Sequence, residues 1–86
     1  MKILKFGASW CGACKALDRE LNKLKDISIE YINVDDDKSE AKVLQYVVKN
    51  LPTLLIVKEE KILYRFSGIV TADKIQKIWE DLNAAN

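Results

Sequence analysis

Apolar residues along the chain follow two periodicities, one typical of β-strands and one typical of α-helices. Short runs rich in apolar and β-branched residues predict strands, over residues 2–7, 27–34, 53–57 and 62–67. Stretches in which apolar residues recur at spacings of three and four predict helices, over residues 13–25, 38–49 and from residue 71 onwards. The predicted order is therefore strand, helix, strand, helix, strand, strand, helix.

This order predicts an α/β fold built on a mixed sheet. The first strand–helix–strand unit should be right-handed, with its two strands parallel. The last two strands are joined by a short polar segment around Glu59, so they should pair as a hairpin. Residues 53–57 are continuously apolar or β-branched, which is typical of a strand covered on both faces, whereas the alternation over 62–67 indicates an edge strand. We expect one four-stranded sheet with helices on both faces.

The second predicted helix follows an acidic run and stops before the single proline. Asp37 is a suitable N-cap with Glu40 three residues later, and the run lacks the spacing of a calcium loop, so we interpret it as a capping signal. Pro52 cannot continue a helix. The residues expected to face the sheet are Ala41, Leu44, Val47 and Val48 in this helix, and Ile75, Ile78, Trp79 and Leu82 in the last one.

Size and charge narrow the class of protein. With 86 residues, we expect one domain covering residues 1–86. The net charge of +1 comes from lysines and arginines spread along the chain, so nothing indicates binding to nucleic acid or to a membrane surface. No apolar run approaches the ~20 residues of a membrane span. Lys5 interrupts the first apolar run, which is too short for a signal peptide, so we expect a cytoplasmic protein.

The two cysteines, Cys11 and Cys14, lie between the first predicted strand and the first predicted helix, a placement typical of a dithiol redox site. A disulfide across so short a loop adds little stability, so its purpose would be chemical. The helix N-terminus favours a thiolate at Cys11, the expected nucleophile, and Cys14 falls on the same helix face. A zinc site is the alternative, but the chain has no histidine and a second copy would have to complete the ligand set.

Four segments together resemble the thioredoxin family. Residues 8–15, which read Ala-Ser-Trp-Cys-Gly-Ala-Cys-Lys, resemble its active-site segment, and residues 33–35 resemble the end of its next strand. Residues 51–55 resemble the segment that holds its cis-proline, and Gly68 stands where the family keeps a glycine near the active site. The resemblance runs through most of the chain. It implies the thioredoxin fold, βαβαββα, and thiol–disulfide exchange with no cofactor beyond the redox-active disulfide.

Three residues beside the cysteines support the site in this interpretation. Trp10 is expected to form a partly exposed platform, although a core position is the alternative. Gly12 is expected to permit the turn between the cysteines and to leave room for a partner backbone. Ala13 replaces the proline that is usual between the cysteines, so a different redox potential is expected.

The resemblance also implies a surface on which substrates dock. In the family, the backbone of the residue before the cis-proline pairs with an extended substrate like an added strand, a role that falls here to Leu51. The residues that would form this surface are Leu51, Pro52, Gly68 and Ile69.

The chain also departs from the family pattern. It starts directly at the strand leading to the active site, so the extra N-terminal strand and helix are not expected. Lys5 stands where the family usually has a buried aspartate that assists proton transfer, and Tyr31 stands where a lysine is usual. The ammonium of Lys5 is expected to reach solvent while its stem packs. The functional alternative is that Lys5 lowers a cysteine pKa or takes the proton of Cys14.

The resemblance implies a protein-disulfide reductase, an electron carrier of thioredoxin type that works as a monomer. Its partners would be disulfide-containing target proteins and a thioredoxin reductase-like electron donor. Two alternatives stay open. A glutaredoxin-like enzyme would use glutathione, although the chain lacks that family's usual Cys-Pro-Tyr-Cys and Gly-Gly-Asp segments. A redox-inactive binding module would carry the two thiols incidentally.

Overall fold

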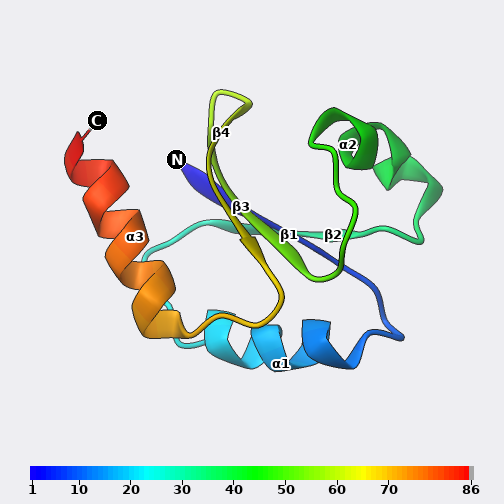
Figure 1. The fold of residues 1–86 in the computed structure, drawn as a ribbon, viewed down its shortest axis with the longest axis horizontal. Coiled ribbons are helices and arrows are strands. Elements are labelled where there is room, and N and C mark those ends of the chain that lie inside the picture. Colours follow the sequence, from blue (N-terminus) through cyan, green and yellow to red (C-terminus); the bar gives the residue numbers. More distant parts are fainter. Residues whose placement is uncertain (86) are drawn as a thin grey trace.

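A computed structural model describes residues 1–85, whose strands form one sheet in the order β2–β1–β3–β4 (Figure 1). The strands are β1 (Lys2–Gly7), β2 (Ile29–Asn33), β3 (Thr53–Lys58) and β4 (Lys61–Ser67). The helices are α1 (Gly12–Leu21), α2 (Glu40–Gln45) and α3 (Ala72–Ala85), with a short 3₁₀ helix, η1 (Asp37–Ser39), before α2. β1 is parallel to β2 and antiparallel to β3, which forms the hairpin with β4. The predicted order and mixed sheet are confirmed.

Helices α1 and α3 cover one face of the sheet (Figure 1). The buried residues of this layer are Ile3, Leu17, Leu21, Leu54, Ile56, Phe66 and Ile75, with Ile78, Trp79 and Leu82 packed against them. Side chains alternate between the faces of a strand, so Lys5 belongs to the same face as Ile3. Its neighbours in the register are Tyr31 of β2 and Leu54 of β3. Lys5 is therefore a charged residue on the face of the sheet that α1 covers.

Helix α2 packs on the other face and is shorter than predicted. It ends at Gln45, and Val47 adopts a left-handed conformation with a φ of 53°. The Val48 N–H donates to the Val43 carbonyl at 3.0 Å, and the Val47 N–H donates to the Leu44 carbonyl at 3.2 Å. These two bonds are those of a Schellman C-cap, with a valine where glycine is usual. Because no glycine marks this end, the sequence pattern predicted a longer helix.

The early end of α2 changes which residues reach the sheet. Leu44 and Val47, expected to be buried, are 71% and 57% exposed, and Ala41 is exposed as well. The residues that pack on this face are Val43, Tyr46 and Val48, against Leu4, Phe6, Ile32, Leu55 and Val57. The predicted apolar face was therefore wrong except at Val48.

Strand β4 is an edge strand, as its alternating pattern predicted. A register shift opposite Ile56 and Val57 interrupts the alternation. Leu63 packs against the α1/α3 layer, whereas Ile62 and Tyr64 are partly exposed.

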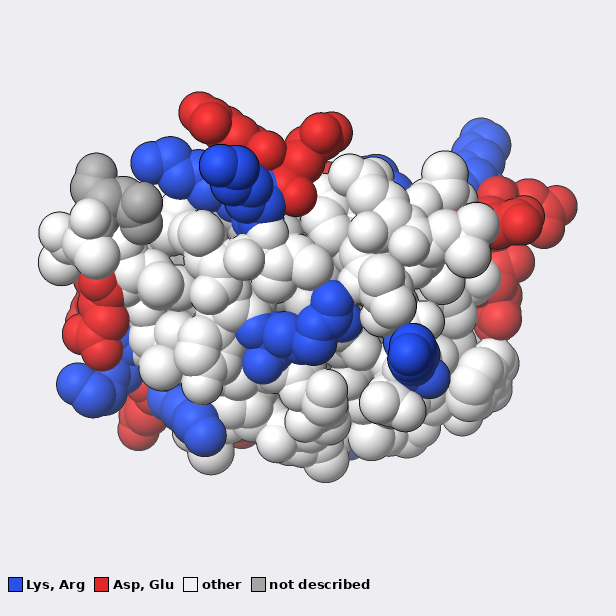
Figure 2. Space-filling view, turned by 45° about the horizontal axis from the view of Figure 1, so that its top comes forward, with Lys and Arg blue, Asp and Glu red and all other residues white. Residues whose placement is uncertain are grey.

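Charged residues of both signs are spread over the face that Figure 2 shows. Acidic side chains lie at the right, on the side of the molecule that carries α2, and also at the top and left edges, whereas the centre is mostly uncharged with two basic patches. Within residues 1–85, no helix combines the length and the apolar character that a membrane-spanning helix needs.

Candidate active site

The two cysteines lie where the chain passes from β1 into α1. Cys11 is the N-cap of α1, in an extended conformation, and its N–H donates to the Ala8 carbonyl at 3.2 Å. Its sulfur accepts a hydrogen bond from the Cys14 N–H at 3.1 Å. Cys11 and Cys14 are joined by a disulfide, with their Cα atoms 5.3 Å apart. The unpaired N–H groups and the dipole at this helix end favour negative charge on Cys11 Sγ when the bond is reduced.

The two cysteine residues differ in how far they are covered. Cys14 is 1% exposed and Cys11 is 8% exposed. Both belong to a small apolar cluster with Ala8, against which Val34 and Leu51 pack. Cys11 is therefore the more accessible of the two cysteines, and Cys14 lies deeper.

Trp10 stands beside the disulfide as an exposed side chain. It is 70% exposed, and its indole N–H donates to the Asp35 carboxylate at 2.8 Å. This places Trp10 at the surface rather than in the core. The next acid, Asp36, caps η1 by accepting from the Lys38 N–H at 3.0 Å, so the cap lies one residue before the predicted Asp37. No group of three His, Cys, Asp or Glu side chains among residues 1–85 is arranged to hold a metal.

Gly12 and Ala13 lie between the cysteines, in the first turn of α1. Gly12 does not adopt a positive φ. A Cβ atom at Gly12 would meet nothing within 4 Å. The open space above Gly12 is consistent with the predicted room for a partner backbone. Ala13 is half-buried and packs against the cysteine cluster.

The Leu51–Pro52 segment packs against the disulfide. Its peptide bond is cis, Pro52 is buried, and Leu51 contacts the cysteine cluster. The Thr53 hydroxyl donates to the Asn50 carbonyl at 2.6 Å, which closes the loop before β3. Among residues 1–85, neither the N–H nor the carbonyl of Leu51 hydrogen-bonds to another residue. Leu51 therefore presents a free backbone donor and acceptor next to Cys11.

Gly68 connects the end of β4 to this segment. Its N–H donates to the Pro52 carbonyl at 3.0 Å, and its φ of 79° lies in the region that favours glycine. The following residue, Ile69, is 58% exposed. The structure thus brings Leu51, Pro52 and Gly68 together beside the cysteines and leaves Ile69 as an apolar side chain at the surface.

Lys5 does not reach solvent, so the expectation that its ammonium would do so was wrong. Its side chain is 8% exposed, and its Nζ lies 3.0 Å from Asp18 Oδ1 of α1. The same nitrogen lies 5.9 Å from the centre of the Tyr31 ring. Burial, and then the negative charge of Asp18, raise the pKa of Tyr31. Lys5, Asp18 and Tyr31 thus form one polar group beneath α1.

Asp18 was not among the residues predicted to belong to the site. Two signals could have identified it. Asp18 follows Cys14 by four residues, so the two side chains lie on the same face of α1. A lysine on a covered strand needs a compensating charge, and Asp18 is the acid of α1 nearest to the cysteines in sequence.

Comparison with known proteins gives the same assignment over most of the chain. The thioredoxin family model matches residues 1–81. Thioredoxin of Chlamydia caviae is 32% identical over 80 residues, which cover 88% of this chain and 76% of that protein. Thioredoxin-1 of Caenorhabditis elegans is 33% identical over 84 residues, which cover 95% and 73% of the two chains.

Solved structures agree with these sequence relatives. The structure of thioredoxin 1 from Thermosipho africanus matches with a TM-score of 0.78 and 28% identity, over 100% of this chain and 99% of that one. The chain spans about half the length of some longer thioredoxin relatives, 48% and 46% in two of them. The matched residues include both cysteines, the Leu51–Pro52 segment and Gly68. The chain belongs to the thioredoxin family.

Proposed function

We propose that this protein is a thiol–disulfide oxidoreductase that reduces disulfides in other proteins. The observation that carries the proposal is the placement of Cys11 at the N-cap of α1, with the buried Cys14 as its disulfide partner. A thiolate at a helix N-terminus is stabilised by the helix dipole and by unpaired N–H groups. Membership of the thioredoxin family supports the same activity.

The reaction consists of two thiol–disulfide exchanges. The Cys11 thiolate attacks one sulfur of the target disulfide, so a mixed disulfide forms and the other target sulfur leaves as a thiolate. Cys14 then loses its proton and attacks Cys11 Sγ, which forms the Cys11–Cys14 disulfide and releases the second target thiolate. Two electrons pass from the dithiol to the target, whose two thiolates take up protons.

Substrate docking is proposed for the surface around Leu51 and Ile69. The free N–H and carbonyl of Leu51 can pair with an extended target segment in the manner of an added strand. Trp10 and Ile69, both more than half exposed, add apolar contact area. The disulfide of the target would then lie over Cys11, above the open space at Gly12.

The cycle requires an electron donor that restores the dithiol, and we propose a thioredoxin reductase-like protein for this role. We also propose that the protein works in the cytoplasm as a monomeric electron carrier. Two cysteines used as one reactive pair, without further cysteines as structural staples, are typical of a reducing compartment.

Insulin reduction tests this function. Wild-type protein with dithiothreitol should precipitate the insulin B chain faster than dithiothreitol alone, and Cys11→Ser should be inactive because it lacks the nucleophile. Cys14→Ser should also fail to turn over, because the mixed disulfide is not resolved. Lys77→Met, in an exposed ion pair of α3, serves as the control and should match wild type. Absence of activity with dithiothreitol or any reductase would support a binding module, and activity that requires glutathione would support a glutaredoxin-like enzyme.

A further inference from the structure

We propose that Lys5 and Asp18 form a proton relay that takes the proton of Cys14 in the second exchange. The proposal rests on the proposed function and adds to it the residues that activate the inner thiol. The need for such a relay follows from burial. Cys14 is 1% exposed, and a thiol in apolar surroundings ionises poorly, yet the thiolate is the form that attacks.

Gly7 brings the Lys5 ammonium and the Cys14 sulfur into one small space. A Cβ atom at Gly7 would lie 2.6 Å from Lys5 Nζ and 3.2 Å from Cys14 Sγ. Both atoms therefore border the same point, where glycine has no side chain. The Lys5 ammonium thus lies beside the Cys14 sulfur, where it can both stabilise a thiolate and exchange a proton with it.

Asp18 connects this space to solvent. Its Oδ1 is buried and lies 3.0 Å from Lys5 Nζ, an ion pair that does not have hydrogen-bond geometry. The oxygen therefore keeps acceptor capacity that no other residue in 1–85 fills. The Asp18 side chain as a whole is 39% exposed. A proton received at Asp18 can leave to water, which a proton held at Lys5 cannot do directly.

The cysteine, the lysine and the aspartate of the proposed relay all line one cavity of about 320 Å³. It is lined by residues that include Lys5, Gly7, Cys14, Asp18 and Tyr31. The titratable groups that border it come from three elements: Lys5 from β1, Tyr31 from β2, and Cys14, Lys15 and Asp18 from α1. The neighbour of Lys5 on β3 is Leu54, which carries no charge. Asp18 is therefore the carboxylate in this cavity.

The relay keeps the charges balanced. While the mixed disulfide is on Cys11, the Cys14 thiol gives its proton to Lys5 Nζ as the ammonium gives one of its own protons to Asp18. Lys5 remains an ammonium, Asp18 becomes a neutral carboxylic acid, and Cys14 becomes a thiolate. The thiolate attacks Cys11 Sγ, and Asp18 returns its proton to water or to the departing target thiolate.

A two-step colour reaction isolates the step in question. The reduced protein is mixed with the aromatic disulfide dithiobis-nitrobenzoate. Attack by Cys11 releases one coloured thiolate, and attack by Cys14 on the resulting mixed disulfide releases a second one. We compare wild type with Asp18→Asn and Lys5→Met over a range of pH. Lys77→Met and Asp81→Asn remove the two members of an exposed lysine–aspartate pair on α3 and are the matched controls.

The relay predicts that Asp18→Asn and Lys5→Met each slow the release of the second thiolate about tenfold or more near neutral pH, and that the release of the first thiolate is unchanged. A loss of this size is expected because a positioned acid or base typically contributes at least about a hundredfold to the rate. The rate should recover at high pH, where hydroxide removes the proton. The double variant should be no slower than the slower single variant, because the two residues act as a unit. If Lys5→Met does not fold, Gly7→Ala, which displaces the ammonium, takes its place.

Second-release rates in Asp18→Asn that follow those of wild type within twofold across the pH range would overturn the relay and leave the dithiol chemistry intact. A wild-type protein that releases one coloured thiolate and never the second would overturn the proposed function itself. The two failures are therefore distinguishable.

Discussion

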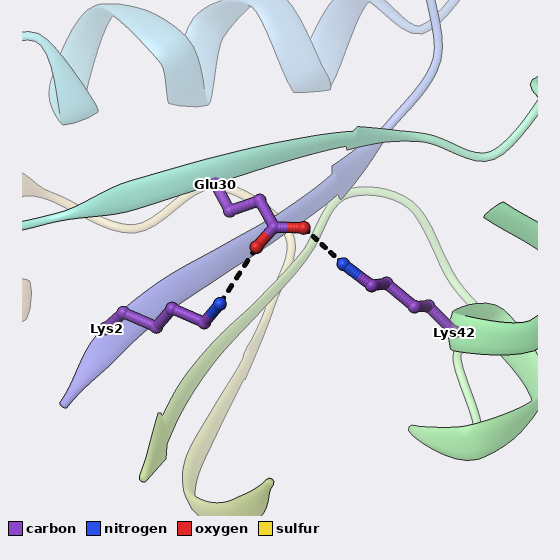
Figure 3. Close-up of polar contacts among 3 residues, drawn as sticks. All are labelled: Lys2, Glu30 and Lys42. Atoms are coloured by element: carbon purple, nitrogen blue, oxygen red, sulfur yellow. Dashed lines mark hydrogen bonds and ion pairs between the residues drawn. The ribbon is translucent and has the colours of Figure 1, made fainter. Parts of the chain in front are cut away.

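Strand β1 carries two lysines that form ion pairs of almost equal length on opposite faces of the sheet. Lys2 lies 2.9 Å from Glu30, and Lys5 lies 3.0 Å from Asp18. Figure 3 shows that Glu30 lies between Lys2 and Lys42, its other partner. The Lys2 side chain is 49% exposed, whereas the Lys5 side chain is 8% exposed. The two pairs therefore differ in solvent access rather than in separation.

This difference decides what each pair can do. At Glu30, hydrogen bonds from Lys42 and then from Lys2 lower the pKa of the carboxyl, and water screens the charges. Such a pair contributes little to stability. At Asp18, the facing lysine is shielded from water, so removal of one partner leaves a charge poorly compensated. The Lys5 end of this pair also borders the Cys14 sulfur.

The largest stability effect is expected for Lys5→Met. The variant keeps the length of the side chain and removes the charge, which leaves Asp18 Oδ1 buried without its cation. We expect a loss of about 1–3 kcal/mol in the free energy of unfolding, measured by urea denaturation. Adding Asp18→Asn should recover part of this loss. A single variant as stable as wild type would show that burial of the pair has no energetic consequence.

Gly7→Ala should have a smaller effect on stability than Lys5→Met. It tests directly how closely the Lys5 ammonium approaches the backbone at Gly7. Its Cβ would displace the Lys5 ammonium, which is the flexible end of a long side chain. We expect a loss of about 1 kcal/mol, at the low end for an overpacked site, in the same denaturation experiment. Gly12→Ala is the control, because its Cβ meets nothing within 4 Å. Equal stabilities of the two alanine variants would argue against the crowding at Gly7.

The smallest effect is expected for Glu30→Gln, and it should depend on pH. The pKa of Glu30 is lowered from 4.5 in the folded protein, so its pairs stabilise the fold above that value and lose this contribution as pH falls through the lowered pKa. The difference from wild type should be several-fold smaller than that of Lys5→Met at neutral pH, and should disappear in acid. A difference that grows as the pH falls would contradict the assignment.

The pattern of apolar residues along the chain predicted strands and helices whose form depends on neighbouring residues in the sequence. The strand formed by the apolar run from Ile3 to Phe6 and the apolar stripe of α3 both follow from the pattern of residues along the chain. The Lys5–Asp18 pair could not be predicted in this way, because the two residues meet only when α1 packs on the sheet. The sequence identified Lys5 as anomalous, and only the fold supplied its partner.

The end of helix α2 is a local feature that the sequence did not predict. A Schellman cap is usually marked by glycine, and here Val47 occupies the left-handed position. Without that signal, the periodicity of the segment predicted that Leu44 would face the core. In the structure Tyr46 packs there.

The central claim is that the Cys11–Cys14 pair donates electrons to protein disulfides. Equilibration of the protein with glutathione buffers of increasing oxidised fraction, followed by alkylation of free thiols and mass measurement, gives the redox potential of the pair. A reductase predicts a potential at or below that of the glutathione couple, so that the pair becomes a disulfide already at a small oxidised fraction of glutathione. A pair that stays dithiol until most of the glutathione is oxidised would have a high potential, would act as an oxidant, and would contradict the proposed function.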